Sequence, residues 1–323
     1  MHQQYPYAAQ PSYDMSGENY RKLRRHGIYV GCCLLGYFAL QEVCVSLLSF
    51  FGYYDAYLSN PAFQYGVAAL IFSFLCLGLP FYLYSRKKGN LSYFKVLPFH
   101  TPQPGKKIVC LVLAGWAMCL AANFVAGYLS SVFAFFGVEE NTPESVASSC
   151  ALDVIMNFLC AAVMAPLVEE FVFRGVVMQP LRRYGEHFAV ITTALFFGLV
   201  HGSPSGIIFA FISGVAIGYA VAYSRSLWVG IIIHALNNAS AVFFSELERF
   251  LPDTSDVLFL IFCIAVIAVG IVAAVIYGFS YGFRLPRDAS GLKAGKKIRA
   301  FYICVPVIIA LVYLLVLISS SIL

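Results

Sequence analysis

Long apolar stretches alternate with short polar intervals along almost the whole chain. A helix that spans a bilayer needs roughly 20 predominantly apolar residues. By this criterion the predicted spans are residues 28–50, 64–85, 108–135, 150–178, 188–201, 206–223, 227–245, 257–283 and 301–320. The fifth stretch is short, so we expect it to be tilted, re-entrant or sheltered inside a bundle. The pattern predicts an all-α, polytopic transmembrane bundle of eight or nine helices with an intramembrane polar cavity.

The polar intervals divide the chain without indicating a soluble domain. We expect a disordered cytoplasmic tail at residues 1–27, N-terminal membrane helices at 28–140, a core that carries the unusual polar residues at 141–245, and C-terminal membrane helices at 246–323. The longest interval after the tail runs from Arg86 to Lys107, where Pro98, Pro102 and Pro104 oppose helix formation.

Composition and charge support a membrane protein. The chain is 60% hydrophobic and 11% charged, which lies outside the range of soluble globular domains. With the N-terminus placed in the cytoplasm, all basic residues except Arg174 and Arg249 fall in the tail or in predicted cytoplasmic loops. This asymmetry follows the positive-inside rule and fits nine crossings best. The net charge of +5 is therefore a topology signal, and we expect membrane lipid but no nucleic acid as a partner. We therefore predict a multi-pass protein located in the plasma membrane.

The sixth span carries a seam of small residues. The seam consists of Gly202, Gly206, Ala210, Gly214, Gly218 and Ala222, which recur every four residues. Small residues let helix backbones approach closely, so we expect this face to pack against the helices that carry the polar groups.

The fourth span contains three ionisable residues that hydrocarbon tolerates only when they are paired or functional. Glu170 and Arg174 are four residues apart with the acid first, which favours an ion pair on one helix face. Glu169 points about 100° away, so it is left free for a reaction. Pro166 cannot donate a backbone hydrogen bond, so we expect a bend that frees the carbonyl of Ala162.

Two further spans supply imidazoles and an amide. His201 ends the fifth span, while His234 and Asn238 are four residues apart and share one face of the seventh. Taken alone, His201 reads as a capping residue, and His234 with Asn238 as interhelical hydrogen-bonding groups. However, Glu169, His201 and His234 lie roughly 15, 21 and 14 Å from the predicted cytoplasmic boundary at 1.5 Å per residue. Such similar depths favour one shared site.

The ordered set Glu169-Glu170-x-x-x-Arg174, Phe197-x-x-x-His201 and His234-x-x-x-Asn238 resembles the CPBP family of intramembrane proteases. That family includes the type II CAAX prenyl endopeptidases and bacterial proteins linked to bacteriocin self-immunity or processing. The likeness covers about 100 residues, from the fourth to the seventh span, so residues 141–245 would be the catalytic core.

The resemblance implies that Glu169 and His201 activate a water molecule and that His234 and Asn238 stabilise the resulting oxyanion. Glu170 and Arg174 would support the site. The expected cofactor is none or zinc, and a zinc ion would be held by Glu169, His201 and His234. The absence of an HExxH motif and the presence of Asn238 favour the metal-free mechanism.

The predicted function is endoproteolysis of a membrane-associated, prenylated or otherwise hydrophobic peptide. Two alternatives stay open from the residues alone. An ion-coupled transporter could relay protons through an intramembrane Glu and His pair. A non-catalytic membrane protein of the bacteriocin-immunity kind would act by binding and would tolerate the loss of Glu169.

Overall fold

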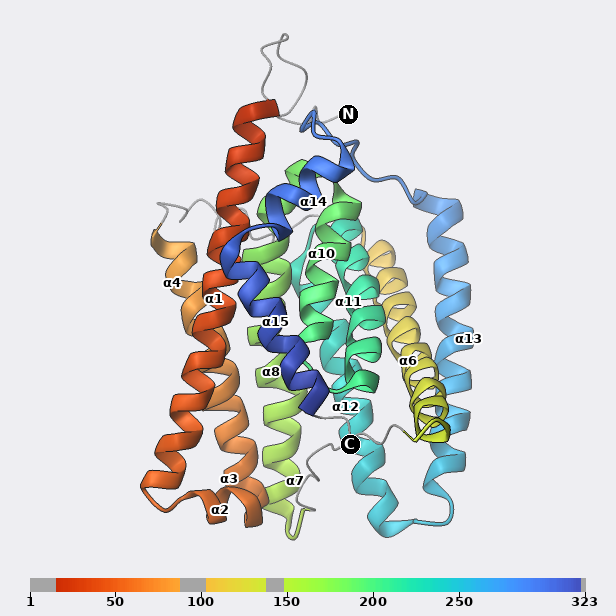
Figure 1. Ribbon diagram of the computed structural model, residues 1–323. Helices are drawn as coiled ribbons and strands as arrows, with labels where there is room; N and C mark the ends of the chain where they lie inside the picture. The colour runs from red at the N-terminus through yellow and green to blue at the C-terminus, as the bar shows by residue number, and fades with distance from the viewer. Residues whose placement is uncertain (1–15, 88–102, 138–147, 321–323) are drawn as a thin grey trace.

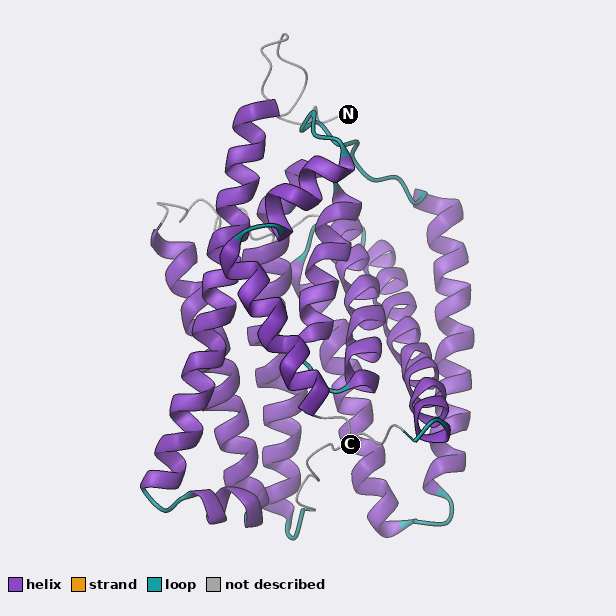
Figure 2. Cartoon of the chain, in the orientation of Figure 1, coloured by secondary structure: helices purple, strands orange, loops and turns teal. Residues whose placement is uncertain are grey.

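The computed structural model describes residues 16–87, 103–137 and 148–320, and every regular element in these ranges is helical (Figure 2). In chain order the elements are α1 (Ser16–Phe50), α2 (Tyr54–Ser59), α3 (Pro61–Gly66), η1 (Val67–Gly78), α4 (Leu79–Lys87), α6 (Gly105–Phe135), α7 (Ala151–Asn157), η2 (Phe158–Met164), α8 (Ala165–Glu170), η3 (Phe171–Val177), α9 (Met178–Leu181), η4 (Arg182–Tyr184), α10 (Glu186–Leu199), α11 (Pro204–Ser224), α12 (Leu227–Phe250), α13 (Ser255–Tyr281), α14 (Ala294–Tyr302) and α15 (Val305–Ser320). The segments η1, η2 and η3 are π-helical and η4 is a 3₁₀ turn.

The predicted polytopic helix bundle is confirmed. The described residues form seven continuous helices that are long and apolar enough to cross a membrane, or eight when the bent pair α14 and α15 is counted as one span. Elements α3, η1 and α4 join into one of these spans, and α7 to η4 join into another, Ala151–Tyr184. The fifth predicted stretch corresponds to α10, which has only 14 residues.

Helices α10 and α11 form a hairpin inside the bundle. Figure 1 shows α10 entering from the end at which α1 begins and α11 returning to that same end, with their turn partway along the bundle. Most of α10 is buried, including Ala189, Val190, Phe196 and Phe197. The expectation of a sheltered helix is therefore correct. The hairpin enters and leaves the bundle at the same end. The side of the membrane assigned to each later loop is therefore the same whether both helices of the hairpin are counted as crossings or neither is.

Small residues allow the close helix contacts that hold this hairpin together. A Cβ added to Gly214 of α11 would lie 3.1–3.2 Å from Phe197 and Ala194 of α10, and one added to Gly218 would lie 2.9 Å from Val190. The predicted seam therefore presses α11 against α10, whose Phe197 lies beside Arg174. This contact fixes Phe197 beside the polar core.

The N-terminal boundary requires a correction. The tail was expected to extend to residue 27, but α1 begins at Ser16. The reason is tertiary packing: Leu23 is fully buried, and Asn19 donates to the carbonyl of Ser290 at 2.9 Å and accepts from Arg183 at 3.1 Å. Residues 1–15 of the expected tail lie outside the described residues, as do Pro98 and Pro102.

Candidate active site

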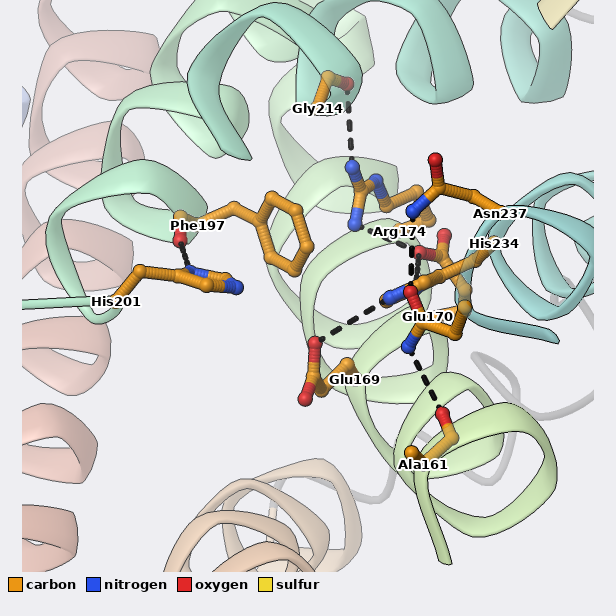
Figure 3. A network of polar contacts seen from close by, with 10 residues as sticks. Ala161, Glu169, Glu170, Arg174, Phe197, His201, Gly214, His234 and Asn237 are labelled. Carbon is orange, nitrogen blue, oxygen red and sulfur yellow. Dashed lines mark hydrogen bonds and ion pairs between the residues drawn. The ribbon is translucent and has the colours of Figure 1, made fainter. Parts of the chain in front are cut away.

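Glu170 lies at the centre of a buried polar network (Figure 3). The side chains of Glu170 and Arg174 are fully buried in the span Ala151–Tyr184, and Arg174 Nη1 donates to Glu170 Oε1 at 2.8 Å. Arg174 Nη2 also donates to the carbonyl of Gly214 at 3.2 Å, and its guanidinium carbon lies 4.3 Å from the centroid of the Phe197 ring. The predicted ion pair is confirmed, and it joins this span to both helices of the α10–α11 hairpin.

His234 of α12 is oriented by the same carboxylate. Its Nδ1 lies 3.0 Å from Glu170 Oε1. Because Glu170 is the ion-pair partner of Arg174, its oxygen accepts, and Nδ1 carries the hydrogen that it donates. The other ring nitrogen, Nε2, then faces Glu169, whose Oε2 is 3.9 Å away. A carboxylate that fixes the tautomer and orientation of an imidazole is a recurrent arrangement in hydrolases.

Helix α12 reaches Glu170 because position 230 is a glycine. A Cβ on Gly230 would lie 2.9 Å from Glu170 Oε2 and 2.8 Å from Val221 Cγ2. Glu170 Oε2 has no hydrogen-bond partner among the described residues. The backbone of α12 therefore packs directly on the buried carboxylate, which brings His234 within hydrogen-bonding distance.

Glu169 differs from its neighbour in access. Its side chain retains 19% of its exposed surface, whereas that of Glu170 retains none. Figure 3 shows the Glu169 carboxylate turned toward the space between His234 and His201. Two adjacent acids therefore have separate environments: one is neutralised and buried, and the other is accessible from the site.

His201 reaches this space from the turn between α10 and α11. Gly202, with a positive φ of 79°, lies in the turn that follows α10, and the Ser203 hydroxyl caps α11 by accepting from the Gly206 amide at 3.2 Å. His201 Nδ1 lies 2.7 Å from the carbonyl of Phe197. A carbonyl can only accept, so Nδ1 donates and Nε2 is left to accept. The His201 side chain is exposed, and it interacts electrostatically with Glu169 and His234.

Asn238 holds a backbone carbonyl that Pro166 leaves free. In the π-helical segment η2, the amide of Ala165 bonds to the carbonyl of Cys160, five residues earlier. In that register an N–H at position 166 would donate to the carbonyl of Ala161, but proline has no N–H. Asn238 Nδ2 donates to this carbonyl instead, at 2.8 Å. The expectation that Ala162 would be freed is therefore wrong by one residue, because it assumed an α-helical register. One N–H of the Asn238 amide is engaged, and the second is available.

Phe197 has a larger part than the sequence indicated. In the sequence, Phe197 was only the first residue of the motif Phe197-x-x-x-His201. In the structure its ring centroid lies 4.9 Å from that of His201 and 5.7 Å from that of His234. Together with its contact to Arg174, this makes Phe197 the apolar wedge between the two histidines. Aromatic identity at a position four residues before a site histidine was the available signal.

Residues of α1 also approach the site from outside the predicted core. Tyr37 forms a hydrogen bond with Gln41 and interacts electrostatically with Glu169. Glu42, which is also an acid within a predicted span, accepts from the hydroxyl of Tyr313 at 2.8 Å. Gln41 is a polar residue inside an apolar stretch, which is the signal that could have found the face of α1 that carries Tyr37.

A zinc ion held by Glu169, His201 and His234 was the alternative to a metal-free site. Zinc ligands each lie about 2.0–2.2 Å from one ion. In the described ranges no group of three or more His, Cys, Asp and Glu side chains converges in a way that could hold a metal ion, and this includes Glu169, His201 and His234. Nε2 of His234 is directed toward the accessible carboxylate of Glu169.

Comparison with known proteins finds similarity in the region that contains the polar core. Residues 151–240 match the family model of the Rce1-like type II CAAX prenyl endopeptidases, within the predicted core of 141–245. The chain is also similar to the membrane-embedded CAAX protease MroQ of Staphylococcus aureus (strain USA300), with 28% identity over 160 residues. This alignment covers 47% of the chain and 64% of the relative, so the chain spans less than two thirds of that protein's length. No solved structure matches the chain.

Proposed function

We propose that this protein is an intramembrane endopeptidase that uses water activated by Glu169 and His201, because residues 151–240 match the family model of the Rce1-like type II CAAX prenyl endopeptidases. The observation that carries the proposal is the difference in burial and ion pairing between two adjacent acids. Glu170 is fully buried and neutralised by Arg174, whereas Glu169 is accessible and lies 3.9 Å from His234.

Water activation requires two acceptors that face one space. The Glu169 carboxylate and the Nε2 lone pair of His201 provide them, since Nδ1 of His201 donates to a carbonyl. A water molecule that donates one hydrogen to each would direct its own lone pair toward the peptide carbonyl. As the carbon–oxygen bond forms, Glu169 takes the proton, and it later returns this proton to the leaving amine as the carbon–nitrogen bond breaks.

Stabilisation of the tetrahedral oxyanion requires donors. The second N–H of Asn238 is available for this role, and the bond to Ala161 fixes the orientation of the amide. His234 would donate through Nε2 when its ring is protonated, because Nδ1–H is held by Glu170. Donors that are fixed before the reaction are the most effective kind of transition-state stabilisation.

The substrate class that fits best is a membrane-associated peptide that is prenylated or otherwise hydrophobic. The relative in Staphylococcus aureus bears the name of a CAAX protease, and the site lies among apolar spans, where such a peptide would be delivered from the lipid. The proposed reaction needs no metal ion.

The test is cleavage by purified protein in vesicles. Three peptides of equal length would be offered: a farnesylated CAAX peptide, its unprenylated form and an apolar transmembrane peptide, with products detected by mass spectrometry. The wild type is expected to cleave at least one of them, with and without a strong chelator. Glu169→Gln should be at least about 100-fold slower, whereas Glu246→Gln, at the far end of α12, should match the wild type. Cleavage of none of the peptides would contradict the proposal, and abolition by the chelator would contradict the metal-free mechanism.

A further inference from the structure

The loop after α13 and the short helix α14 carry an exposed basic surface away from the candidate active site. The basic side chains exposed on this surface are Arg284, Arg287, Lys293, Lys296 and Arg299. Between residues 282 and 302 the sequence has one acid, Asp288, and it is already paired with Lys297. In the part of the chain that the structure describes, none of the five exposed cations forms an ion pair.

The position of α14 places this surface at the edge of the membrane-spanning bundle. Helix α14 meets α15 at an angle of 77°, so it turns away from the direction of the span that follows it. Figure 1 shows α14 lying across the end of the bundle at which α1 begins, above α10. Apolar side chains are exposed among the basic ones: Phe283 is 57% exposed, Ile298 52% and Ile303 58%.

A surface of this kind matches the chemistry of a lipid headgroup layer. Basic side chains attract anionic headgroups, and neighbouring apolar side chains enter the acyl boundary below them. A free anion would satisfy the charges but would leave the three apolar side chains in water. We propose that the basic surface of α14 and its preceding loop binds anionic phospholipid. This proposal does not depend on the enzymatic function.

The opposite face of α14 shows why bound lipid should stabilise the protein. Phe301 is fully buried, and its ring centroid lies 6.0 Å from that of Phe196 and 6.3 Å from that of Phe188. The Tyr302 ring stacks on Phe196 with an interplanar angle of 10°. Lipid that holds α14 in place therefore also holds Phe196 of α10. The residue after Phe196 is Phe197, which separates the two site histidines.

The break between α14 and α15 is tightly packed as well. A Cβ on Gly27 of α1 would lie 2.5 Å from the carbonyl oxygen of Phe301, and one on Gly31 would lie 2.5 Å from the amide nitrogen of Val307. The bend therefore rests directly on the backbone of α1. A ligand that binds α14 only in this position should shift the unfolding equilibrium of the bundle.

The experiment measures the thermal unfolding midpoint of the full chain in a neutral detergent. Dihexanoyl phosphatidylglycerol, dihexanoyl phosphatidylcholine and inorganic phosphate would be titrated separately. At about ten times the dissociation constant, the anionic lipid is expected to raise the midpoint by about 2–4 °C. The zwitterionic lipid and phosphate should leave the midpoint unchanged. Raising the salt concentration to about 0.5 M should reduce the shift caused by the anionic lipid.

Variants locate the effect. Lys296→Glu with Arg299→Glu should abolish the shift, and Lys296→Gln with Arg299→Gln should reduce it at least several-fold, which keeps the test decisive where the charge reversal fails to fold. Arg249→Gln, at the opposite end of the bundle, should retain the full shift. An undiminished shift in the α14 variants, an equal response to the zwitterionic lipid, or an equal response to inorganic phosphate would overturn the proposal.

Discussion

The side-chain amide of Asn238 donates a hydrogen bond to the backbone carbonyl of Ala161 at 2.8 Å, across two spans. This bond exists because Pro166 has no amide hydrogen and the surrounding helix is in the π register. Asn238 therefore has a structural bond in addition to its proposed role as an oxyanion donor, and the two can be separated by mutation.

Asn238→Leu should lower both stability and activity. It removes a partly buried hydrogen bond to the Ala161 carbonyl, which costs about 1 kcal/mol, and the loss of an oxyanion donor typically lowers kcat about 10²–10³-fold. Adding Pro166→Ala supplies a backbone amide for that carbonyl and should recover most of the stability but none of the activity. Thermal unfolding and peptide cleavage, measured side by side, check this. Recovery of cleavage in the double variant would show that Asn238 acts only through Ala161.

The buried ion pair predicts strong coupling between its partners. Arg174→Met leaves Glu170 fully buried without its cation, and loss of one partner of a buried pair costs about 3–5 kcal/mol. The combination Glu170→Gln with Arg174→Met removes both charges and should restore part of that stability. Activity should stay low, because His234 loses the carboxylate that orients it. A single Arg174→Met variant as stable as the wild type would contradict the coupling.

Gly230→Ala should disturb the site without touching any polar residue. The new Cβ would lie 2.9 Å from Glu170 Oε2 and 2.8 Å from Val221, and overpacking of this kind costs about 1–3 kcal/mol. Gly127→Ala on α6 is the matched control, since a Cβ there meets nothing within 4 Å and alanine favours a helix. The unfolding midpoint should fall for Gly230→Ala alone. Equal midpoints in the two variants would show that α12 does not rest on Glu170.

Asp288 gives the protein a pH-dependent anchor near α14. Partial burial raises the pKa of this carboxyl, but hydrogen bonds from Lys297 and Ser290 outweigh it, so the pKa lies below its usual 3.8. A lowered pKa in the folded protein stabilises at pH values above 3.8, and this contribution is lost as the pH falls through the folded-state pKa. Asp288→Asn should therefore unfold at a lower temperature than the wild type at pH 7. The difference should shrink below pH 3.8 and then vanish, and a difference that does not change with pH would contradict the role of Asp288.

Features that depend on composition and short spacing could be predicted from the sequence. Apolar stretches gave the spans, since only helices satisfy their own backbone in hydrocarbon. The four-residue spacing of Glu170 and Arg174 predicted the ion pair, and the repeating small residues predicted the close packing face of α11. Each of these follows from the geometry of one helix.

Features that depend on tertiary register could not be predicted. The hydrogen bond between His234 and Glu170 joins residues 64 positions apart, and no local pattern selects Glu170 over Glu169 as the partner. The shift from Ala162 to Ala161 follows from a single π turn, which leaves hydrophobic periodicity almost unchanged. The start of α1 at Ser16 depends on contacts with Ser290 and Arg183, which lie far along the chain.

In the proposed mechanism, Glu169 activates the water that cleaves the peptide. Single-turnover cleavage in ¹⁸O-labelled water tests it most directly, with substrate binding measured separately for the wild type and Glu169→Gln. We expect one ¹⁸O atom in the new carboxylate of the wild-type product, and for Glu169→Gln a chemical step at least about 100-fold slower with unchanged substrate affinity. A product without the label, or a Glu169→Gln variant that cleaves at the wild-type rate, would contradict it.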